Sequence, residues 1–398
     1  MARLIVASVT LCMIAVGCGK NQSESPQSPA SNSNQSRGPG ELTVQQSVSS
    51  ETDFSIPRLS PKPVMWLSEY EAADELSPER EEAKRLVRVA DMLKGQEVYD
   101  KAGLVYEQAI NMDPTWPYPP YQLACNLELS GDHEQASAMF EQAVNLGLDD
   151  FPTVLEDNEL GEIRQDPDFM NSLARIRKLY IEDAPIRVGQ PLAIQPDGEK
   201  PQDGRPMILL LHGYGDSNLS YLDNAQRWAD LGFVAVAVPG SVPLSVGRFR
   251  WWLDSLEPTL EDLQAIVNSP LFDEIVDRER VYLLGFSQGA LHAMLLTFDH
   301  PDVFAGVIVL SPGGGMAERM IHPKIQTART AKLAFIHGLN EAQYEPYVDH
   351  WRDACEAAGW QYTSRTHAGG HHFPEDWDEM RIELAGFLLA DGVDTNRE

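Results

Sequence analysis

The sequence predicts an α/β fold, a mostly parallel sheet covered by helices, preceded by an all-helical domain. Apolar runs recur from about residue 185 onward, helical patterns lie between them, and the part before them is helical without strand-like alternation. Apolar strands that alternate with helices indicate a parallel sheet with both faces covered. We therefore expect four parts, which are residues 1–17, 18–60, 61–183 and 184–392.

The strands of the last part are predicted from short apolar runs. They are Met207–Leu211, Phe233–Val238, Val281–Leu284, Val307–Leu310 and Leu333–Ile336, with a final strand at Gln361–Thr366. Helical patterns lie at 218–231, 260–267, 344–358 and 377–389. A functional site is expected at the carboxyl ends of such strands.

Composition excludes some classes of function. The formal net charge is −29, and a field of that sign repels a phosphate backbone, so no nucleic-acid partner is expected. No cysteine or histidine cluster has the spacing of zinc ligands, so no metal site is predicted. Cys125 and Cys355 lie in different predicted domains and are expected to be separate thiols.

The N-terminus has the pattern of an export signal. Arg3 precedes an apolar run, Leu4–Val16, that is too short to span a bilayer and has the length of a signal peptide. The run ends in Ala15-Val16-Gly17-Cys18, which resembles the lipobox of bacterial lipoproteins, with Ala15 where Leu is most usual. That resemblance implies a lipid on Cys18 and a membrane-anchored protein of the cell envelope. The alternative is an ordinary secretory signal with a chance cysteine.

Residues 18–60 are predicted to be a flexible tether. They are rich in Ser, Asn, Gln and Pro and contain few large apolar side chains, so they bury too little surface to offset the entropy of ordering. A tether after an anchor would hold the folded part away from the membrane.

The helical part contains an internal repeat. Ala102, Tyr106 and Ala109 recur 34 positions later as Ala136, Phe140 and Ala143. Small, aromatic and small residues at this spacing resemble the second helix of the tetratricopeptide repeat. The alternative is a helical hairpin with coincidental alanines. The repeats could bind a protein or peptide partner, or pack on the enzyme.

A nucleophile motif follows the predicted strand Val281–Leu284. Gly285-Phe286-Ser287-Gln288-Gly289 lies between that strand and a helix, and this is the pattern of a G-x-S-x-G elbow. A side chain at either glycine would collide with the tight turn, which exposes the hydroxyl of Ser287. Ser287 is the predicted nucleophile.

The other members of a serine-hydrolase site follow in order. His212-Gly213-Tyr214-Gly215 ends a strand, so the amides of Tyr214 and Gln288 are the predicted oxyanion hole. The base is expected after the last strand, in Gly369-Gly370-His371-His372, and we assign it to His371 rather than His372. We therefore expect activity to fall at low pH, as His371 becomes protonated.

The acid of the triad is assigned to Glu341. It ends His337-Gly338-Leu339-Asn340-Glu341, which resembles a loop that supplies an aspartate in many related enzymes, so Glu replaces the usual Asp. Asp349 and Asp376 are the alternatives. A carboxylate is needed to fix the histidine tautomer and stabilise the imidazolium.

Together these segments resemble the phospholipase/carboxylesterase group of α/β-hydrolases, the acyl-protein-thioesterase-like enzymes. The segments are His212–Asp216, Gly285–Ala290, His337–Glu341 and Gly369–Pro374, and Arg248–Trp252 is similar to a tryptophan-bearing loop of that group. The resemblance implies a serine esterase or thioesterase without a cofactor, acting on a small ester or thioester. Arg248–Trp252 would line an acyl pocket or lie on the sheet edge.

One alternative function is a weakly active or inactive lipoprotein of this fold that binds partners through its repeats. Other chemistries of the same fold use Cys or Asp as the nucleophile, and Ser287 argues against both. A peptidase of the same superfamily stays open as an alternative, although such enzymes usually carry a large propeller rather than helical repeats.

Overall fold

The computed structural model describes residues 54–71, 77–245, 247–252, 254–313 and 331–390. The predicted signal peptide, the lipidation residue Cys18 and most of the predicted tether lie outside the described residues. Within the described part of the chain, no helix is long and apolar enough to cross a membrane.

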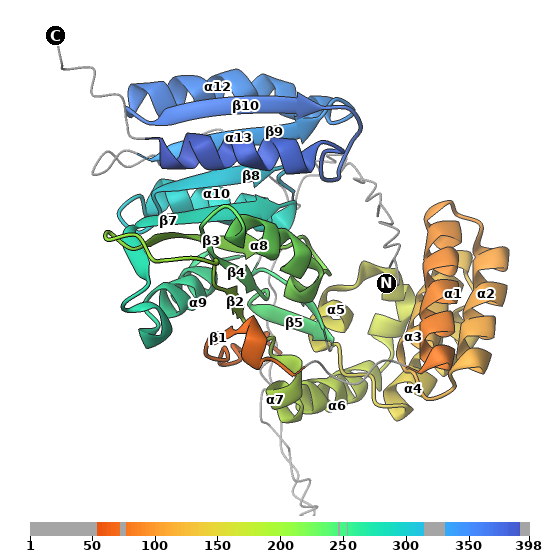
Figure 1. Cartoon of the computed structure of the whole chain (residues 1–398). Helices are drawn as coiled ribbons and strands as arrows, with labels where there is room; N and C mark the ends of the chain where they lie inside the picture. The colour runs from red at the N-terminus through yellow and green to blue at the C-terminus, as the bar shows by residue number, and fades with distance from the viewer. Residues whose placement is uncertain (1–53, 72–76, 246, 253, 314–330, 391–398) are drawn as a thin grey trace, which may run out of the picture. The chain divides into compact units, whose positions relative to one another are not determined.

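An eight-stranded sheet forms the centre of the C-terminal part in the described residues (Figure 1). Its order is β1-β2-β4-β3-β7-β8-β9-β10, and every neighbouring pair is parallel except β2 and β4. The strands are β1 (Met65–Trp66), β2 (Leu192–Ile194), β3 (Arg205–Leu211), β4 (Val234–Val238), β7 (Val276–Phe286), β8 (Gly306–Leu310), β9 (Lys332–Gly338) and β10 (Gln361–His367).

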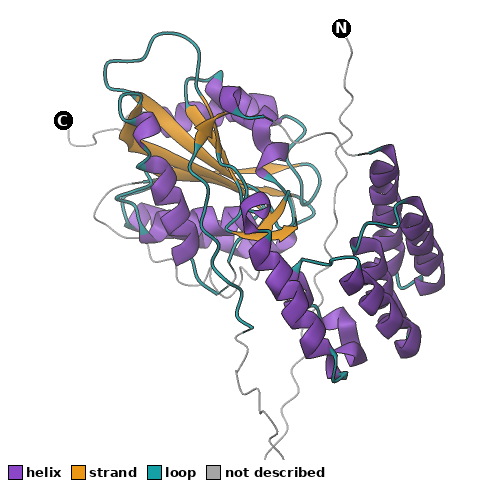
Figure 2. Ribbon diagram, turned by 90° about the horizontal axis from the view of Figure 1, so that it is seen from below, coloured by secondary structure: helices purple, strands orange, loops and turns teal. Residues whose placement is uncertain are grey.

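Helices cover both faces of this sheet (Figure 2). One face packs against α9 (Glu257–Val267), α10 (Gln288–Asp299) and α12 (Glu345–Ala357). The other packs against α8 (Leu222–Ala229) and α13 (Trp377–Leu389). The central strands β3 and β4 are buried along their whole length, as expected for strands enclosed by two layers of helices. The predicted fold class is confirmed.

The sequence did not predict two short strands at the edge of the main sheet, nor a separate two-stranded hairpin. β1 and β2 extend the sheet beyond β4. β5 (Val242–Ser245) and β6 (Arg248–Arg250) form a separate antiparallel hairpin. Each is too short to give an alternating apolar pattern that a sequence reader could recognise.

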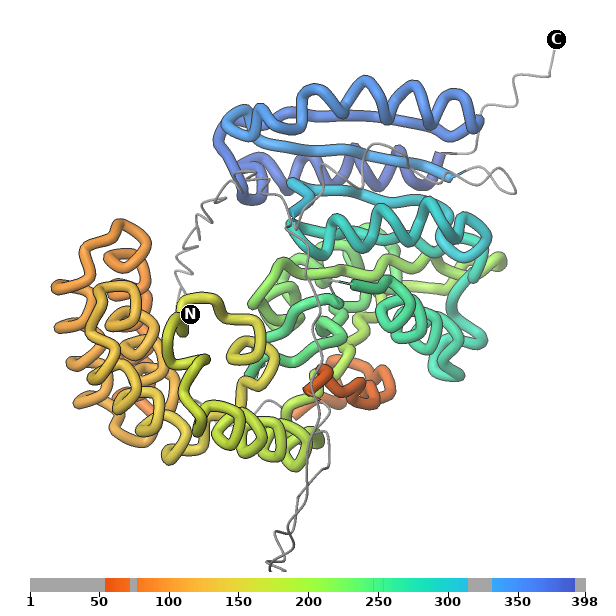
Figure 3. The backbone as a smooth tube through the Cα atoms, turned by 180° about the vertical axis from the view of Figure 1, so that it is seen from behind, coloured from red at the N-terminus to blue at the C-terminus, as the bar shows by residue number. Residues whose placement is uncertain are grey.

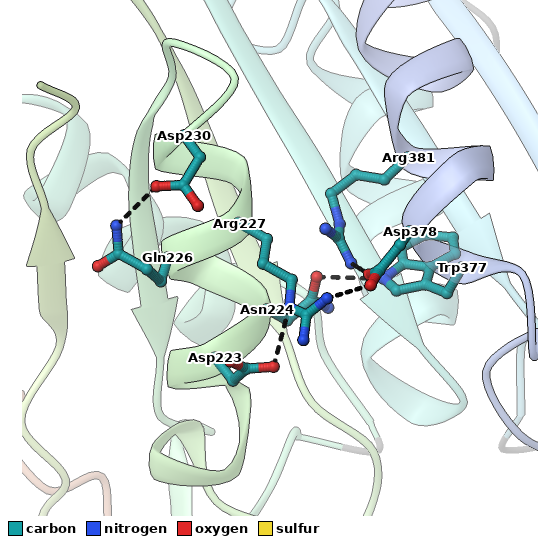
Figure 4. Close-up of polar contacts among 8 residues, drawn as sticks. All are labelled: Asp223, Asn224, Gln226, Arg227, Asp230, Trp377, Asp378 and Arg381. Carbon is teal, nitrogen blue, oxygen red and sulfur yellow. Dashed lines mark hydrogen bonds and ion pairs between the residues drawn. The ribbon is translucent and has the colours of Figure 1, made fainter. Parts of the chain in front are cut away.

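Polar contacts join α8 to α13, the two helices that share one face of the sheet (Figure 4). Arg227 on α8 pairs with Asp378 on α13, and Asp378 also accepts a hydrogen bond from Arg381 at 2.6 Å. The indole of Trp377 donates to the side chain of Asn224 at 3.2 Å. Because α13 directly follows the loop that contains His371, these contacts help fix where that loop ends.

Two antiparallel helical hairpins precede the sheet, and Figure 3 shows their helices stacked side by side. They are α1 (Pro78–Gly95) with α2 (Tyr99–Met112), and α3 (Tyr118–Ser130) with α4 (His133–Asn145). Three shorter helices follow, α5 (Phe151–Glu156), α6 (Phe169–Glu182) and α7 (Ala184–Arg187). The all-helical part is therefore as predicted.

The residues that suggested a repeat occupy equivalent buried positions. The four alanines at 102, 109, 136 and 143 are fully buried, and the rings of Tyr106 and Phe140 fill the space between neighbouring helices. Classification of these hairpins as tetratricopeptide-like remains a prediction. The helical core also takes up the end of the predicted tether, because Leu59 is buried and Phe54 and Ile56 pack against it. Packing thus begins before the predicted boundary at residue 61.

Replacing Tyr106 with Phe should destabilise the helical part while keeping its packing. The Tyr106 hydroxyl donates to Asp91 at 2.6 Å. Burial raises the pKa of Asp91, and this hydrogen bond partly opposes that rise. Loss of the donor should cost about 1–3 kcal/mol of unfolding free energy at pH 7, measured by urea denaturation. Phe140, at the equivalent position of the second hairpin, shows that a phenyl ring fits there.

The loss should depend on pH. The hydrogen bond favours the ionised form of Asp91, so the difference between wild type and variant should be greatest at neutral pH. It should shrink as the pH falls and Asp91 becomes protonated in both proteins. An equal loss at every pH would contradict this explanation.

Candidate active site

Ser287 lies in a strained turn between β7 and α10. Its backbone has φ 55° and ψ −121°, a conformation that residues other than glycine rarely adopt. A Cβ at Gly285 would overlap the backbone of Gly289 and Ala290, and one at Gly289 would overlap the carbonyl oxygens of Leu211 and His212. The two glycines therefore let α10 start directly against β3 and β7, and the turn presents the side chain of Ser287 beyond the sheet.

The three predicted triad residues come together in one hydrogen-bonded row. His371 Nε2 lies 2.9 Å from Ser287 Oγ, and His371 Nδ1 lies 2.8 Å from Glu341 Oε1. A carboxylate only accepts, so Nδ1 bears the proton and Nε2 is free to accept the serine proton. These three residues come from the ends of β7, β9 and β10, as the chain order Ser, acid, His requires.

Glu341 is buried, and both oxygens of its carboxylate accept hydrogen bonds from described residues. Oε1 accepts from His371, and Oε2 accepts from Ser311 Oγ at 2.6 Å and from the amide of Gly338 at 2.8 Å. The Glu341 amide itself donates to Gly338 O at 2.9 Å. Burial alone would raise the pKa of Glu341, but the hydrogen bonds from His371, Ser311 and Gly338 lower it overall. The acid therefore stays ionised at neutral pH.

The acid loop and the base loop are joined through their backbones. Leu339 donates to His367 O at 2.9 Å, and Asn340 donates to Gly369 O at 2.8 Å. A Cβ at Gly338 would lie 2.6 Å from Gly369 O, so only glycine allows this approach. The distance between acid and base is thus set by main-chain bonds rather than by flexible side chains.

A buried frame holds the two segments that contain the predicted oxyanion amides. The indole of Trp251 donates to His212 O at 2.8 Å. The main chain of Trp251 also pairs with the amide side chain of Gln288, donating at 3.0 Å and accepting at 3.2 Å. One residue therefore connects the loop of Tyr214 to the first turn of α10, where the amide of Gln288 lies.

His212 is held as one neutral tautomer. Its Nε2 accepts from the amide of Gly240 at 2.9 Å, so its Nδ1 must be the protonated nitrogen that donates to Gly213 O at 2.7 Å. Burial lowers the pKa of His212, which favours this neutral form. The bond to Gly213 fixes the peptide that precedes Tyr214.

The segment Arg248–Trp252 begins in a hydrogen-bonded hairpin, and its predicted place in an acyl pocket stays a prediction. Its first residues form β6, which bonds to the oxyanion loop through Gly215 N to Phe249 O at 2.8 Å and Phe249 N to Asp216 O at 2.9 Å. On its other side Arg250 pairs with Glu156 of α5 at 2.8 Å. This hairpin lies between the helical part and the oxyanion loop.

The remaining candidates lie elsewhere. The alternative acid Asp349 pairs with Arg352 on α12, and Asp376 precedes α13 as its N-cap. His372 contacts its own loop through Phe373 O and Gly370 N rather than Ser287. Sequence reasoning missed Ser311, a single hydroxyl directly after β8 that gives no pattern of its own.

One group of described residues could offer three metal-ligand atoms, Cys125, Asp157 and Glu159 in the helical part. Its atoms already have protein partners: Asp157 accepts from Tyr121 and from Cys125 Sγ, and Glu159 pairs with Lys94. Burial raises the pKa of the Cys125 thiol well above its usual value, and the negative charge of Asp157 raises it further. A thiol kept protonated beside an ammonium group is a poor metal ligand, so we assign no metal to this group.

Comparison with known proteins agrees with the fold. Residues 202–346 match the family model described as serine aminopeptidase S33. NocK of Nocardia uniformis subsp. tsuyamanensis, a protein described as an esterase, is 33% identical over 114 residues. That match covers 26% of this chain and 32% of NocK, so the chain spans about a third of the length of this relative.

Solved structures with a similar fold include a carboxylesterase from Bacillus cereus, at 18% identity and a TM-score of 0.42, covering 52% of this chain and 98% of that one. A carboxylesterase from Mesorhizobium loti has 21% identity and a TM-score of 0.38, covering 47% and 90%. An uncharacterized protein from Bacillus cereus ATCC 10987 has 14% identity and a TM-score of 0.41, covering 77% and 98%.

Replacing Glu341 with Gln should lower kcat on an ester by about 10³–10⁴-fold with little change in KM. The amide keeps the shape of the side chain, but it supplies no charge to stabilise the imidazolium of His371. Steady-state kinetics of the purified variant would measure the loss. Asp349→Asn and Asp376→Asn are the matched controls and should keep wild-type rates. A comparable loss in either control would place the acid elsewhere.

Replacing Ser311 with Ala should cost about 1.5–3 kcal/mol of unfolding free energy at neutral pH, the usual worth of a hydrogen bond to a charged group. The folded pKa of Glu341 is lowered, so its contribution is present above its unfolded pKa and is lost as the pH falls through the folded value. The gap between wild type and variant should therefore close in acid. Urea denaturation between pH 7 and pH 3 measures it, and a gap that widens in acid would refute the role given to Ser311.

Proposed function

We propose that this protein is a serine hydrolase that cleaves carboxylic esters or thioesters through an acyl-enzyme intermediate. The observation that supports it most directly is His371, which bridges Ser287 Oγ and the buried carboxylate of Glu341 with bonds of 2.9 and 2.8 Å. A nucleophile bonded to a base that is oriented by a third group is the arrangement that activates a serine.

In the proposed mechanism, His371 Nε2 takes the proton of Ser287 as Oγ attacks the carbonyl carbon. Glu341 holds the Nδ1 proton and stabilises the imidazolium. The amides of Tyr214 and Gln288 stabilise the oxyanion of the tetrahedral intermediate. His371 then gives the proton to the leaving alcohol or thiol. A water molecule repeats the sequence on the acyl-enzyme, releasing the acid and restoring Ser287.

We also propose that the protein is a lipoprotein of the cell envelope, tethered through a lipid on Cys18 and residues 18–60. The support is the sequence pattern of Leu4–Val16 and Ala15–Cys18 alone. The helical hairpins, which we propose to be tetratricopeptide-like, contact the hydrolase part through the ring of Tyr118 on α3, which lies under the guanidinium of Arg248. One of their roles is therefore to pack on it.

The purified protein should hydrolyse p-nitrophenyl esters, and Ser287→Ala should abolish turnover. The alanine removes only the attacking oxygen, so the residual rate should be at least about 10³-fold lower. Esters of increasing acyl length, and a matched thioester, would identify the preferred acyl group and leaving group.

Ser364→Ala is a matched control, because Ser364 lies in β10 away from the elbow. It should keep the wild-type rate. A well-folded wild type with no more turnover than Ser287→Ala on any ester would reject the hydrolase proposal. It would favour the alternative, an inactive protein of this fold that binds partners through its helical part.

A further inference from the structure

The three residues after β8 contact both the acid and the nucleophile of the candidate site. Ser311 donates to Glu341 Oε2 at 2.6 Å, and Pro312 O accepts from the hydroxyl of Tyr344. Gly313 donates its amide proton to Ser287 O at 2.9 Å. The segment is thus anchored to the acid at one end and to the nucleophile's own carbonyl at the other.

Gly313 lies next to the reacting atom. A Cβ at this position would be 2.9 Å from Ser287 Oγ and 3.5 Å from the amide nitrogen of Gln288. The first distance is too short for a real side chain, so something would have to move. The atoms that it meets belong to the nucleophile and to one predicted oxyanion donor, and not to a neighbouring core.

The backbone of Gly313 does not itself require glycine. Positive φ values occur at ten other glycines and at Glu97, Ser287 and Ser311 in the described residues, but not at Gly313. Gly313 is also half-exposed, so it fills no place in the core. Neither backbone strain nor core packing therefore explains why residue 313 is a glycine. The remaining explanation is the space that glycine leaves open beside Ser287 Oγ.

That space is where a reacting carbonyl must lie. A near-attack carbonyl carbon is about 3–3.5 Å from the attacking oxygen, and its oxyanion must come within about 2.7–3.1 Å of the donor amides. A Cβ at 313 would lie 2.9 Å from Ser287 Oγ, slightly closer than the reacting carbon itself, and 3.5 Å from the Gln288 amide nitrogen. It would compete with the substrate for the same volume.

We propose that Gly313 is a specificity-determining residue that keeps open the position of the scissile carbonyl and the first atoms of the acyl group. This inference rests on the proposed function. It goes further by naming the residue that limits the size of the acyl group beside the nucleophile. Ser311 and the hydrogen bond from Gly313 to Ser287 O hold the segment at the distance that this role needs.

The test is Gly313→Ala with Gly386→Ala as the matched control. Gly386 lies within α13, has no positive φ, and a Cβ there would meet nothing within 4 Å. Kinetics on p-nitrophenyl acetate, butyrate and hexanoate give kcat and KM for each protein. Labelling of Ser287 by a fluorophosphonate, followed by mass spectrometry, reports on the nucleophile without turnover. Thermal unfolding and near-UV circular dichroism report on folding.

Gly313→Ala should lower kcat/KM by about 10²-fold or more, since a misplacement of about 1 Å has that effect on a reaction centre. The loss should increase from acetate to hexanoate, Ser287 should label more slowly, and the unfolding midpoint should stay near that of wild type. Gly386→Ala should match wild type in rate and labelling.

A Gly313→Ala variant with the rate and acyl preference of wild type would overturn the inference. A variant that loses activity only together with its folded structure would overturn it too, because the residue would then be structural. If wild type neither hydrolyses the esters nor labels at Ser287, the proposed function fails and this inference fails with it.

Discussion

The site depends on how closely the backbone of α10 approaches the backbone of β3. At Gly289 there is no room for a Cβ, because the carbonyl oxygens of Leu211 and His212 occupy that position. The close approach forces the turn at Ser287 into its strained conformation, at a typical cost of about 1–3 kcal/mol that the surrounding structure must offset. It also places the first amide of α10 next to the loop after β3. The positions of Ser287 and of the predicted oxyanion donors therefore both follow from this one packing constraint.

Fixed contacts at both ends of the side chain also explain how a glutamate can take the place of the usual aspartate as the predicted triad acid. The extra methylene of Glu341 does not loosen the site, because both oxygens are engaged, one by His371 and the other by Ser311 and the Gly338 amide. Each carboxylate oxygen of Glu341 is thus held by at least one hydrogen bond. The backbone bonds from Leu339 and Asn340 to the base loop then set its reach.

The three triad residues could be predicted from the sequence, because each lies in a short local motif. Ser287 and Glu341 follow apolar strands, His371 follows the last strand, and each lies within three residues of a glycine, so their positions and order were predictable. Ser311 and Trp251 were not assigned these roles. Their contacts join segments far apart in the chain, such as Trp251 with Gln288, and no periodicity encodes a contact between distant segments. Short elements such as β1, β2 and β6 were missed for the related reason that their stability comes from pairing rather than from their own residues.

The helical part is physically continuous with the catalytic machinery. Arg250 is almost completely buried, and its charge is balanced by Glu156 of α5, outside the sheet. The neighbouring residue Trp251 connects both oxyanion segments, and Arg248 donates to Gly215 O at 3.2 Å while its guanidinium lies over the ring of Tyr118. Removing the helices would leave the buried Arg250 charge without its partner, directly beside Trp251, which connects the two segments that contain the predicted oxyanion amides. The helices therefore belong to the same folded unit as the hydrolase part.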